Sequence, residues 1–278
     1  MLVAVTDILE QLSVWQAVAA VGIGFVAGAL GGMLGVGGSV IVIPGLTIVL
    51  GPAQHLYQAL AMVVNVIVSV PAARRHYQHH AMTPDALRWM LPAAVVFVMI
   101  GVWMSNLAVF TGADGELLLR RLLAAFLVYV IIVNVRKLWH ESRPHALAET
   151  QPDRIGRFAA TGVGAAMGSF AGLLGIGGGA VSVPLQQVFL RLPLRSCIAN
   201  SSAVICISAS LGAIYKNATL AQHNESWQVS LVMAALLAPT AYYGGRFGAK
   251  MTHRLPIRQV RLAFVALMIV GAWRMAGL

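Results

Sequence analysis

Long apolar stretches separated by short polar segments dominate the chain. They cover residues 14–50, 56–73, 86–107 and 117–138 in the first half, and 157–190, 195–215, 226–245 and 257–276 in the second. About 20 apolar residues suffice for a helix to cross a bilayer. Because the runs are continuous, they favour helices over the alternating strands of a transmembrane barrel. The pattern predicts an all-α polytopic membrane protein.

The first stretch of each half is interrupted by glycines. Residues 22–44 read GIGFVAGALGGMLGVGGSVIVIP, and residues 162–184 read GVGAAMGSFAGLLGIGGGAVSVP. Nine of the 23 aligned positions are identical, seven of them glycine. We predict helix breaks at 35–39 and 175–179. A break within hydrocarbon is typical of a protein-buried cavity, and matching breaks in two halves point to a transporter binding site.

The duplication extends to the last stretch of each half. At an offset of 138 residues the identical pairs are Arg120/Arg258, Ala125/Ala263, Phe126/Phe264, Ile131/Ile269 and Arg136/Arg274. We therefore predict a first repeat module at 1–139 and a second at 157–278. The polar segment at 140–156 is expected to be a cytoplasmic linker between them.

The short arms after the breaks leave two topologies open. Residues 40–50 and 180–190 each span about 16 Å as helix, too little to cross a bilayer alone. Either each broken unit crosses once, or it forms a re-entrant hairpin and the two modules are inverted. The inverted arrangement puts 15 of the 19 Lys and Arg residues inside, which the positive-inside rule favours. The four left outside are Arg120, Arg121, Lys216 and Arg274.

Composition agrees with a membrane protein. Hydrophobic residues make up 59% of the chain and charged residues 10%, whereas about a quarter of a soluble domain is charged. The net charge is +10, and the basic residues lie between the apolar stretches. We therefore predict contact with lipid and no nucleic-acid partner. The N-terminal residues lack the features of a removable signal peptide. We expect a multi-pass protein of the cell (plasma or inner) membrane.

The two breaks suggest how an anion is held. A helix N-terminus presents unpaired N–H groups, and glycine lets a ligand approach them and permits positive φ. The predicted substrate-binding residues are Gly37, Gly38, Ser39, Gly177, Gly178, Gly179, Asn200, Ser201 and Ser202. For Gly24, Gly28 and Gly32, helix packing is the favoured alternative. Ser201 and Ser202 are equally well explained by bonds to a carbonyl one turn earlier.

Other polar residues are given structural interpretations. All nine Asp and Glu lie outside the apolar stretches, which argues against a carboxylate proton relay. We predict no cofactor and no metal site, and a surface role for His76, His79 and His80. His55 and Tyr57 are interpreted as interfacial aromatic-belt residues. Asn65 is expected to make an interhelical hydrogen bond.

The duplicated glycine helix, the G-[VI]-G-G break, the short arm and the following proline resemble the sulfite exporter TauE/SafE family over nearly the whole chain. The resemblance implies transport of small sulfur-containing anions, mainly outward. One departure concerns the helix after each break. Ala199–Ser202 (ANSS) is polar in the second module, whereas the corresponding Ala59–Met62 (ALAM) is apolar.

These observations favour a permease that exports sulfite, sulfonates or related anions by alternating access. An importer or bidirectional permease for another small anion is the main alternative, and an intramembrane enzyme or scaffold is the weaker one. The predicted partners are a small anion and the bilayer. No catalytic residues are predicted. The sequence leaves substrate, direction, coupling ion and oligomeric state open.

Overall fold

The computed structural model describes residues 13–140, 155–251 and 257–276, and this part of the chain contains helices and no strands. The predicted all-α class is confirmed. The elements are α2 (Val14–Leu34), α3 (Ser39–Leu50), α4 (Gln54–Gln78), α5 (Pro84–Ser105), η1 (Ala108–Phe110), α6 (Gly112–His140), α7 (Arg157–Leu174), α8 (Gly179–Phe189), α9 (Leu194–Thr219), η2 (Leu220–His223), α10 (Trp227–Met251) and α11 (Ile257–Met275).

Five of the described helices are long and apolar enough to cross a membrane: α2, α4, α5, α6 and α9. Large apolar side chains are exposed around the outside of the bundle, where a lipid environment would cover them. They include Trp15, Trp103, Trp139, Phe158, Val188, Ile214 and Trp273. The multi-pass membrane character predicted from the sequence is therefore confirmed.

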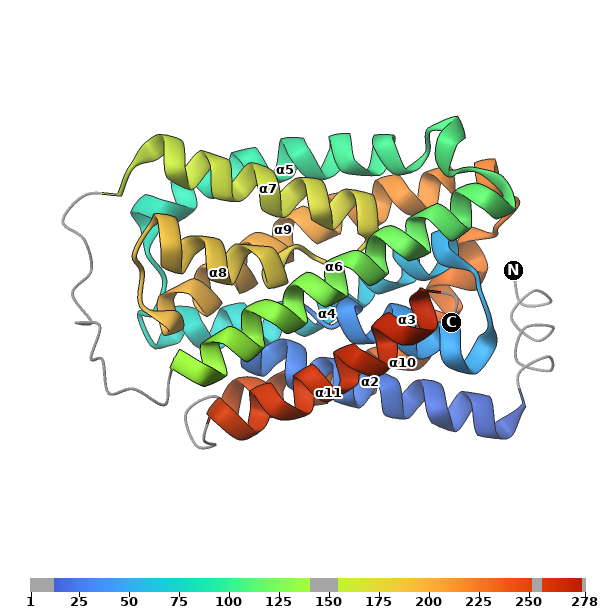
Figure 1. The fold of residues 1–278 in the computed structure, drawn as a ribbon, viewed down its shortest axis with the longest axis horizontal. Helices are drawn as coiled ribbons and strands as arrows, with labels where there is room; N and C mark the ends of the chain where they lie inside the picture. The colour runs from blue at the N-terminus through green and yellow to red at the C-terminus, as the bar shows by residue number, and fades with distance from the viewer. Residues whose placement is uncertain (1–12, 141–154, 252–256, 277–278) are drawn as a thin grey trace.

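The chain leaves the helical conformation at both predicted breaks. It turns between α2 and α3, and α3 runs back beside α2 toward the right-hand end of the bundle in Figure 1. It turns again between α7 and α8, and α8 returns beside α7 toward the opposite end. The two hairpins thus open at opposite ends of the bundle. Their placement in a bilayer and the division into inverted modules stay predictions, and most of the predicted linker at 140–156 lies outside the described residues.

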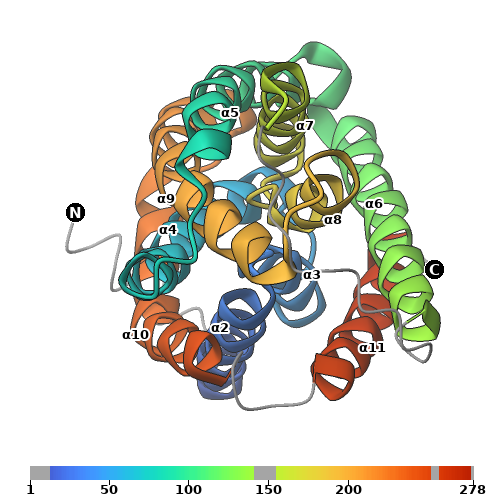
Figure 2. The same cartoon turned by 90° about the vertical axis from the view of Figure 1, so that its left-hand side faces the viewer.

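Each glycine-rich helix packs against a helix of the other half. α2 lies along α10, and α7 lies along α5 (Figure 2). A Cβ on Gly28 would collide with the carbonyl of Ala241, and one on Gly168 would collide with the carbonyl of Ala94. A Cβ on Gly32 would lie 2.5 Å from the carbonyl oxygen of Gly245, and one on Gly24 would lie 3.0 Å from that of Leu237, both in α10. The packing interpretation of Gly24, Gly28 and Gly32 is confirmed, because only glycine lets these backbones approach so closely.

The centre of the bundle is formed by α4 and α9, which contact each other and carry many buried residues. The short arms α3 and α8 pack against them, while α6 and α11 pair on one flank (Figure 2). This arrangement brings both breaks to the middle of the protein, against α4 and α9.

Three interpretations of polar residues are wrong. His76 is buried rather than on the surface, at 3% exposure, because α4 continues through the basic segment to Gln78. His55 and Tyr57 are also buried, so neither belongs to an exposed aromatic belt. His79 and His80 are exposed as predicted.

Candidate functional site

The two helix breaks touch each other in the interior. A Cβ added to Gly179 would collide with the carbonyl oxygen of Gly35 and lie 2.7 Å from Cα of Val36. A Cβ on Gly37 would lie 3.7 Å from the carbonyl oxygen of Ile176. Each break is the turn of a hairpin, and the two hairpins enter the bundle from opposite ends. The hairpins therefore meet at their turns.

Positive φ angles explain some of the break glycines but not all of them. Gly37 (φ 82°), Gly177 (φ 68°) and Gly178 (φ 72°) adopt the left-handed conformation that favours glycine. Gly38 has φ −78°, so it does not use the positive φ that glycine permits. At Gly179 the requirement is steric instead, because the other break occupies the space of a side chain.

Asn65, in the middle of α4, lies between the two breaks. Its Oδ1 accepts a hydrogen bond from the backbone N–H of Ser39 at 3.0 Å, and its Nδ2 donates to Ser39 Oγ at 2.9 Å. A Cβ on Gly177 would lie 2.6 Å from Asn65 Nδ2. The expected interhelical hydrogen bond is confirmed. Its position at the break was missed, although an asparagine in the middle of an apolar stretch is the signal that could have indicated it.

The remaining space at the breaks is small. A cavity of about 10 Å³ is lined by Gly31, Gly35, Gly37, Val68, Ser69, Ala72, Ser202 and Ile205. Such a volume accommodates about one water molecule. A solute larger than water would fit only if the breaks and the helices beside them separated.

Ser202 is the one predicted α9 residue that lines this cavity, together with residues of the first break. Its hydroxyl donates to the carbonyl of Ile198 at 2.9 Å. The alternative of a bond to the preceding turn is thus confirmed for Ser202, whose hydroxyl oxygen keeps acceptor capacity toward the cavity.

Asn200 and Ser201 belong to a different polar cluster, between α8 and α9. Ser201 Oγ donates to Ser182 Oγ at 3.0 Å, so the bond to the preceding turn does not apply to it. Gln186 Nε2 lies 2.8 Å from Ser182 Oγ and 3.0 Å from Ser201 Oγ. Asn200 Nδ2 donates to Gln186 Oε1 at 3.1 Å, and Asn200 Oδ1 accepts from the N–H of Thr83 at 2.9 Å.

We call Ser182, Gln186, Asn200 and Ser201 the Gln186 cluster; all four side chains are fully buried. Ser182 and Gln186 lie one and two helical turns along α8 from its first residues. The predicted site residues therefore divide into a group at the breaks and a group displaced toward the end where α8 finishes. Ser182 and Gln186 were missed, because one polar residue per turn in a short apolar arm is a weak sequence signal.

The apolar Ala59–Met62 segment of α4 is completely buried. Met62 forms an apolar cluster with Val102 of α5 and Ala213 of α9. We call these three residues the Met62 layer. In the first half, apolar packing thus takes the place of the hydroxyl and amide groups that the second half carries at the corresponding positions.

Comparison with known proteins matches residues 20–275 to the family model described as sulfite exporter TauE/SafE. The chain is similar to the protein named "Probable membrane transporter protein MamO" of Paramagnetospirillum magneticum, with 26% identity over 95% of this chain and 45% of that protein. It is also similar to the protein named "Probable membrane transporter protein YunE" of Bacillus subtilis, with 22% identity over 90% of this chain and 93% of that one. The chain thus spans less than half the length of MamO. No solved structure matches it significantly.

Proposed function

Because the chain belongs to the sulfite exporter TauE/SafE family, we propose that this membrane transporter carries small sulfur-containing anions, such as sulfite or sulfonates, out of the cell by alternating access. The single observation that carries the proposal is the contact between the two broken helices in the protein interior. There, the N-terminus of α3, which Asn65 holds, and the N-terminus of α8 lie close together, next to a small cavity.

The chemistry of the breaks suits a transported anion. The N-termini of α3 and α8 both begin at the breaks, and helix N-termini favour negative charge through their unpaired N–H groups and the helix dipole. Ser39 and Asn65 supply neutral polar groups beside the N-terminus of α3. Neutral donors bind an anion without holding it so tightly that it cannot leave.

The distribution of carboxylates supports passive export. Within the described residues, Asp85, Asp114 and Glu116 lie near the first turns of α5 and α6, and Glu225 lies in the connection before α10. The interior of the described helices carries no carboxylate to relay protons. A monovalent anion that leaves a cell with a negative interior gains about 2.3 kcal/mol per 100 mV, so export requires no coupled ion.

Flux through reconstituted protein tests this function. Liposomes that contain the purified protein are loaded with radiolabelled sulfite or methanesulfonate, and efflux is measured against protein-free liposomes. We expect protein-dependent efflux that becomes faster when the lumen is made negative. Absence of flux for every anion tested would refute the proposal.

The same preparation separates the alternatives. Reversing the anion gradient measures uptake, and uptake that exceeds efflux at equal driving force would favour an importer. Chemical analysis of the released solute distinguishes a transporter, which leaves the anion intact, from an enzyme, which converts it.

A further inference from the structure

A lysine is buried at the end of the bundle where α9 finishes. Lys216 is 0% exposed, although it lies on a helix that is otherwise apolar enough to cross a membrane. The ion pairs among the described residues do not include it. Burying a charge without a counter-charge is costly, and an ionisable residue within a membrane span is by default a functional candidate.

The partners of Lys216 are three neutral acceptors. Its Nζ lies 2.9 Å from His55 Nδ1, 2.9 Å from Ser105 Oγ and 2.9 Å from Asn106 Oδ1. His55 Nε2 lies 2.9 Å from the carbonyl oxygen of Phe110, which only accepts, so Nε2 carries the proton and Nδ1 accepts from the lysine. All three donor positions of Nζ are taken by neutral groups, so a protonated Lys216 has no counter-charge among the described residues.

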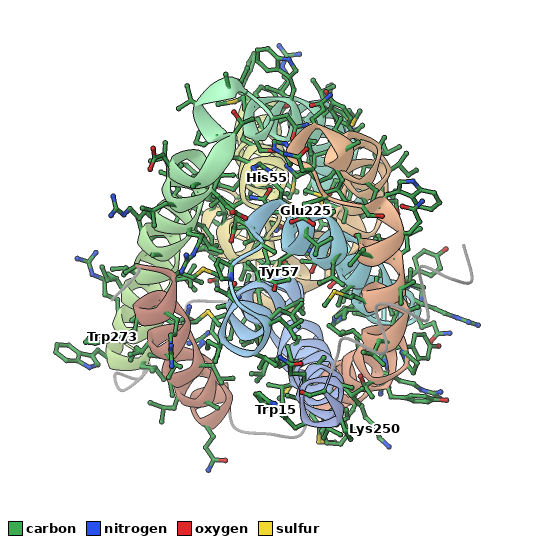
Figure 3. All side chains as sticks on the ribbon, turned by 90° about the vertical axis from the view of Figure 1, so that its right-hand side faces the viewer. Trp15, His55, Tyr57, Glu225, Lys250 and Trp273 are labelled. Atoms are coloured by element: carbon green, nitrogen blue, oxygen red, sulfur yellow. The ribbon has the colours of Figure 1, made fainter. Side chains whose placement is uncertain are left out.

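A polar vestibule opens beside this group. The His55 ring stacks on His223 with 3.5 Å between the ring centres. Both rings line a pocket of about 260 Å³, together with Thr111, Gly112, Glu116, Gln222, Asn224 and Glu225. Figure 3, which looks onto this end of the bundle, shows His55, Tyr57 and Glu225 near its centre and Trp273 at its edge. Lys216 is therefore separated from the pocket by the histidine pair.

The vestibule itself is acidic rather than basic. Burial raises the pKa of the Glu225 carboxyl, and the nearby Glu116 raises it further. The Glu116 carboxylate also accepts a hydrogen bond from the N–H of Gln54. Two neighbouring carboxylates repel an anion, so the vestibule is an electrostatic barrier between Lys216 and the outside, and an anion is more stable at Lys216 than in the vestibule.

The position of Lys216 relates it to the helix breaks. On α9 it follows Ser202 by 14 residues, about 21 Å of helix, and on α4 its partner His55 precedes Asn65 by 10 residues, about 15 Å. The Met62 layer lies between these positions on both helices: Met62 between His55 and Asn65 on α4, and Ala213 between Ser202 and Lys216 on α9. A solute that moved from the breaks along α4 and α9 would have to cross this packed apolar cluster before it reached Lys216.

We propose that Lys216 is a second anion-binding station, which takes a small oxyanion between the helix breaks and the vestibule. The oxyanion replaces Asn106 Oδ1 and His55 Nδ1 as acceptor of the ammonium protons, so every Lys216 donor stays satisfied while the buried charge gains its counter-ion. This inference rests on the proposed anion transport and adds the point at which the anion pauses before release.

Asn106→Asp is the decisive variant because it is nearly isosteric. It keeps an oxygen next to Nζ but supplies a permanent counter-charge, so we expect sulfite efflux to fall about tenfold or more while the protein stays folded. Lys216→Met removes the charge and should give a similar loss, whereas Lys216→Arg should retain efflux. Lys250→Met, which removes an exposed lysine of α10, is the matched control and should leave efflux unchanged.

Wild-type efflux in Asn106→Asp would refute anion binding at Lys216. This holds even if Lys216→Met were inactive or unfolded, because the lysine would then have a structural role. Thermal unfolding with sulfite, sulfate and phosphate gives a readout that does not depend on flux. If the wild-type protein moves no anion but is stabilised by one, and Asn106→Asp is not, the station stands and the proposed transport fails. If no anion stabilises the wild-type protein, the station fails as well.

Discussion

The two broken helices share a backbone plan but differ in how their second arms begin. In the first half, the N-cap Gly38 has φ −78° and the following Ser39 is held through its N–H and its hydroxyl by Asn65. In the second half, the N-cap Gly178 has φ 72°, and Gly179 carries no side chain. At the 140-residue offset, Asn65 corresponds to Ile205, which cannot accept a hydrogen bond.

The difference indicates a division of roles between the halves. The start of α3 has an internal acceptor, so its first N–H is already satisfied. The start of α8 has no acceptor at the corresponding position, and it lies directly against the other break. We therefore expect an anion to be held more by the second arm than by the first. Four substitutions test this asymmetry.

Gly179→Ser should have the largest effect, because it gives the second arm the residue of the first. The new Cβ would collide with the Gly35 carbonyl and force the breaks apart. We expect a loss of about 3 kcal/mol in the free energy of unfolding and no measurable sulfite efflux. The assay is denaturation of the purified protein, combined with liposome flux.

Gly38→Ala is the matched control for this change. Gly38 already has a φ suited to other residues, and the nearest atom to its new Cβ would lie 3.4 Å away. Its stability and flux should stay close to wild type. Equal damage from both substitutions would mean that the close approach of the two breaks does not distinguish the halves.

Asn65→Leu should come next in size. It leaves the N–H and the hydroxyl of Ser39 without their partner in a buried site, which costs about 2–3 kcal/mol. The first arm would then resemble the second, with an unpaired N–H at its start. Asn134→Leu is the control, since Asn134 only bonds to Val130 within its own helix. A similar loss of stability in both variants would contradict a special role for Asn65.

The element boundaries followed closely from the sequence. The predicted breaks at 35–39 and 175–179 agree with α3 beginning at Ser39 and α8 at Gly179. Some longer helices extend beyond the predicted apolar stretch: the stretch at 56–73 is part of α4, which extends from Gln54 to Gln78. Hydropathy ends where basic residues such as Arg74 begin, but the backbone hydrogen bonds of a helix continue past the apolar segment.

The candidate site was predicted only in part, because hydropathy does not fix how a buried helix is rotated. Ser202 faces the cavity at the breaks, whereas Asn200 and Ser201 face Gln186. These residues are neighbours in sequence, but successive helical positions point about 100° apart. The burial of Lys216 could not be predicted either, because it depends on His55, Ser105 and Asn106, which come from distant segments.

Asn200→Leu tests the Gln186 cluster, which lies away from the breaks. Thr83 N–H and Gln186 Oε1 would each lose their Asn200 partner, which lowers the free energy of unfolding by about 1–2 kcal/mol. Because the Asn200 amide is already occupied by protein groups, we expect the KM for sulfite to stay near its wild-type value. A higher KM in a protein of unchanged stability would instead identify Asn200 as an anion ligand.

Ser39→Ala should have the smallest effect of the four. The backbone N–H of residue 39 keeps its bond to Asn65 Oδ1, and only the bond from Asn65 Nδ2 to the hydroxyl is lost. We expect a decrease of about 0.5–1.5 kcal/mol in the free energy of unfolding, the net value of one ordinary hydrogen bond. Flux should persist, because the main anion contacts are assigned to the second arm. If Ser39→Ala abolished sulfite efflux without unfolding the protein, its hydroxyl would be a direct ligand, and the first arm would hold the anion as much as the second.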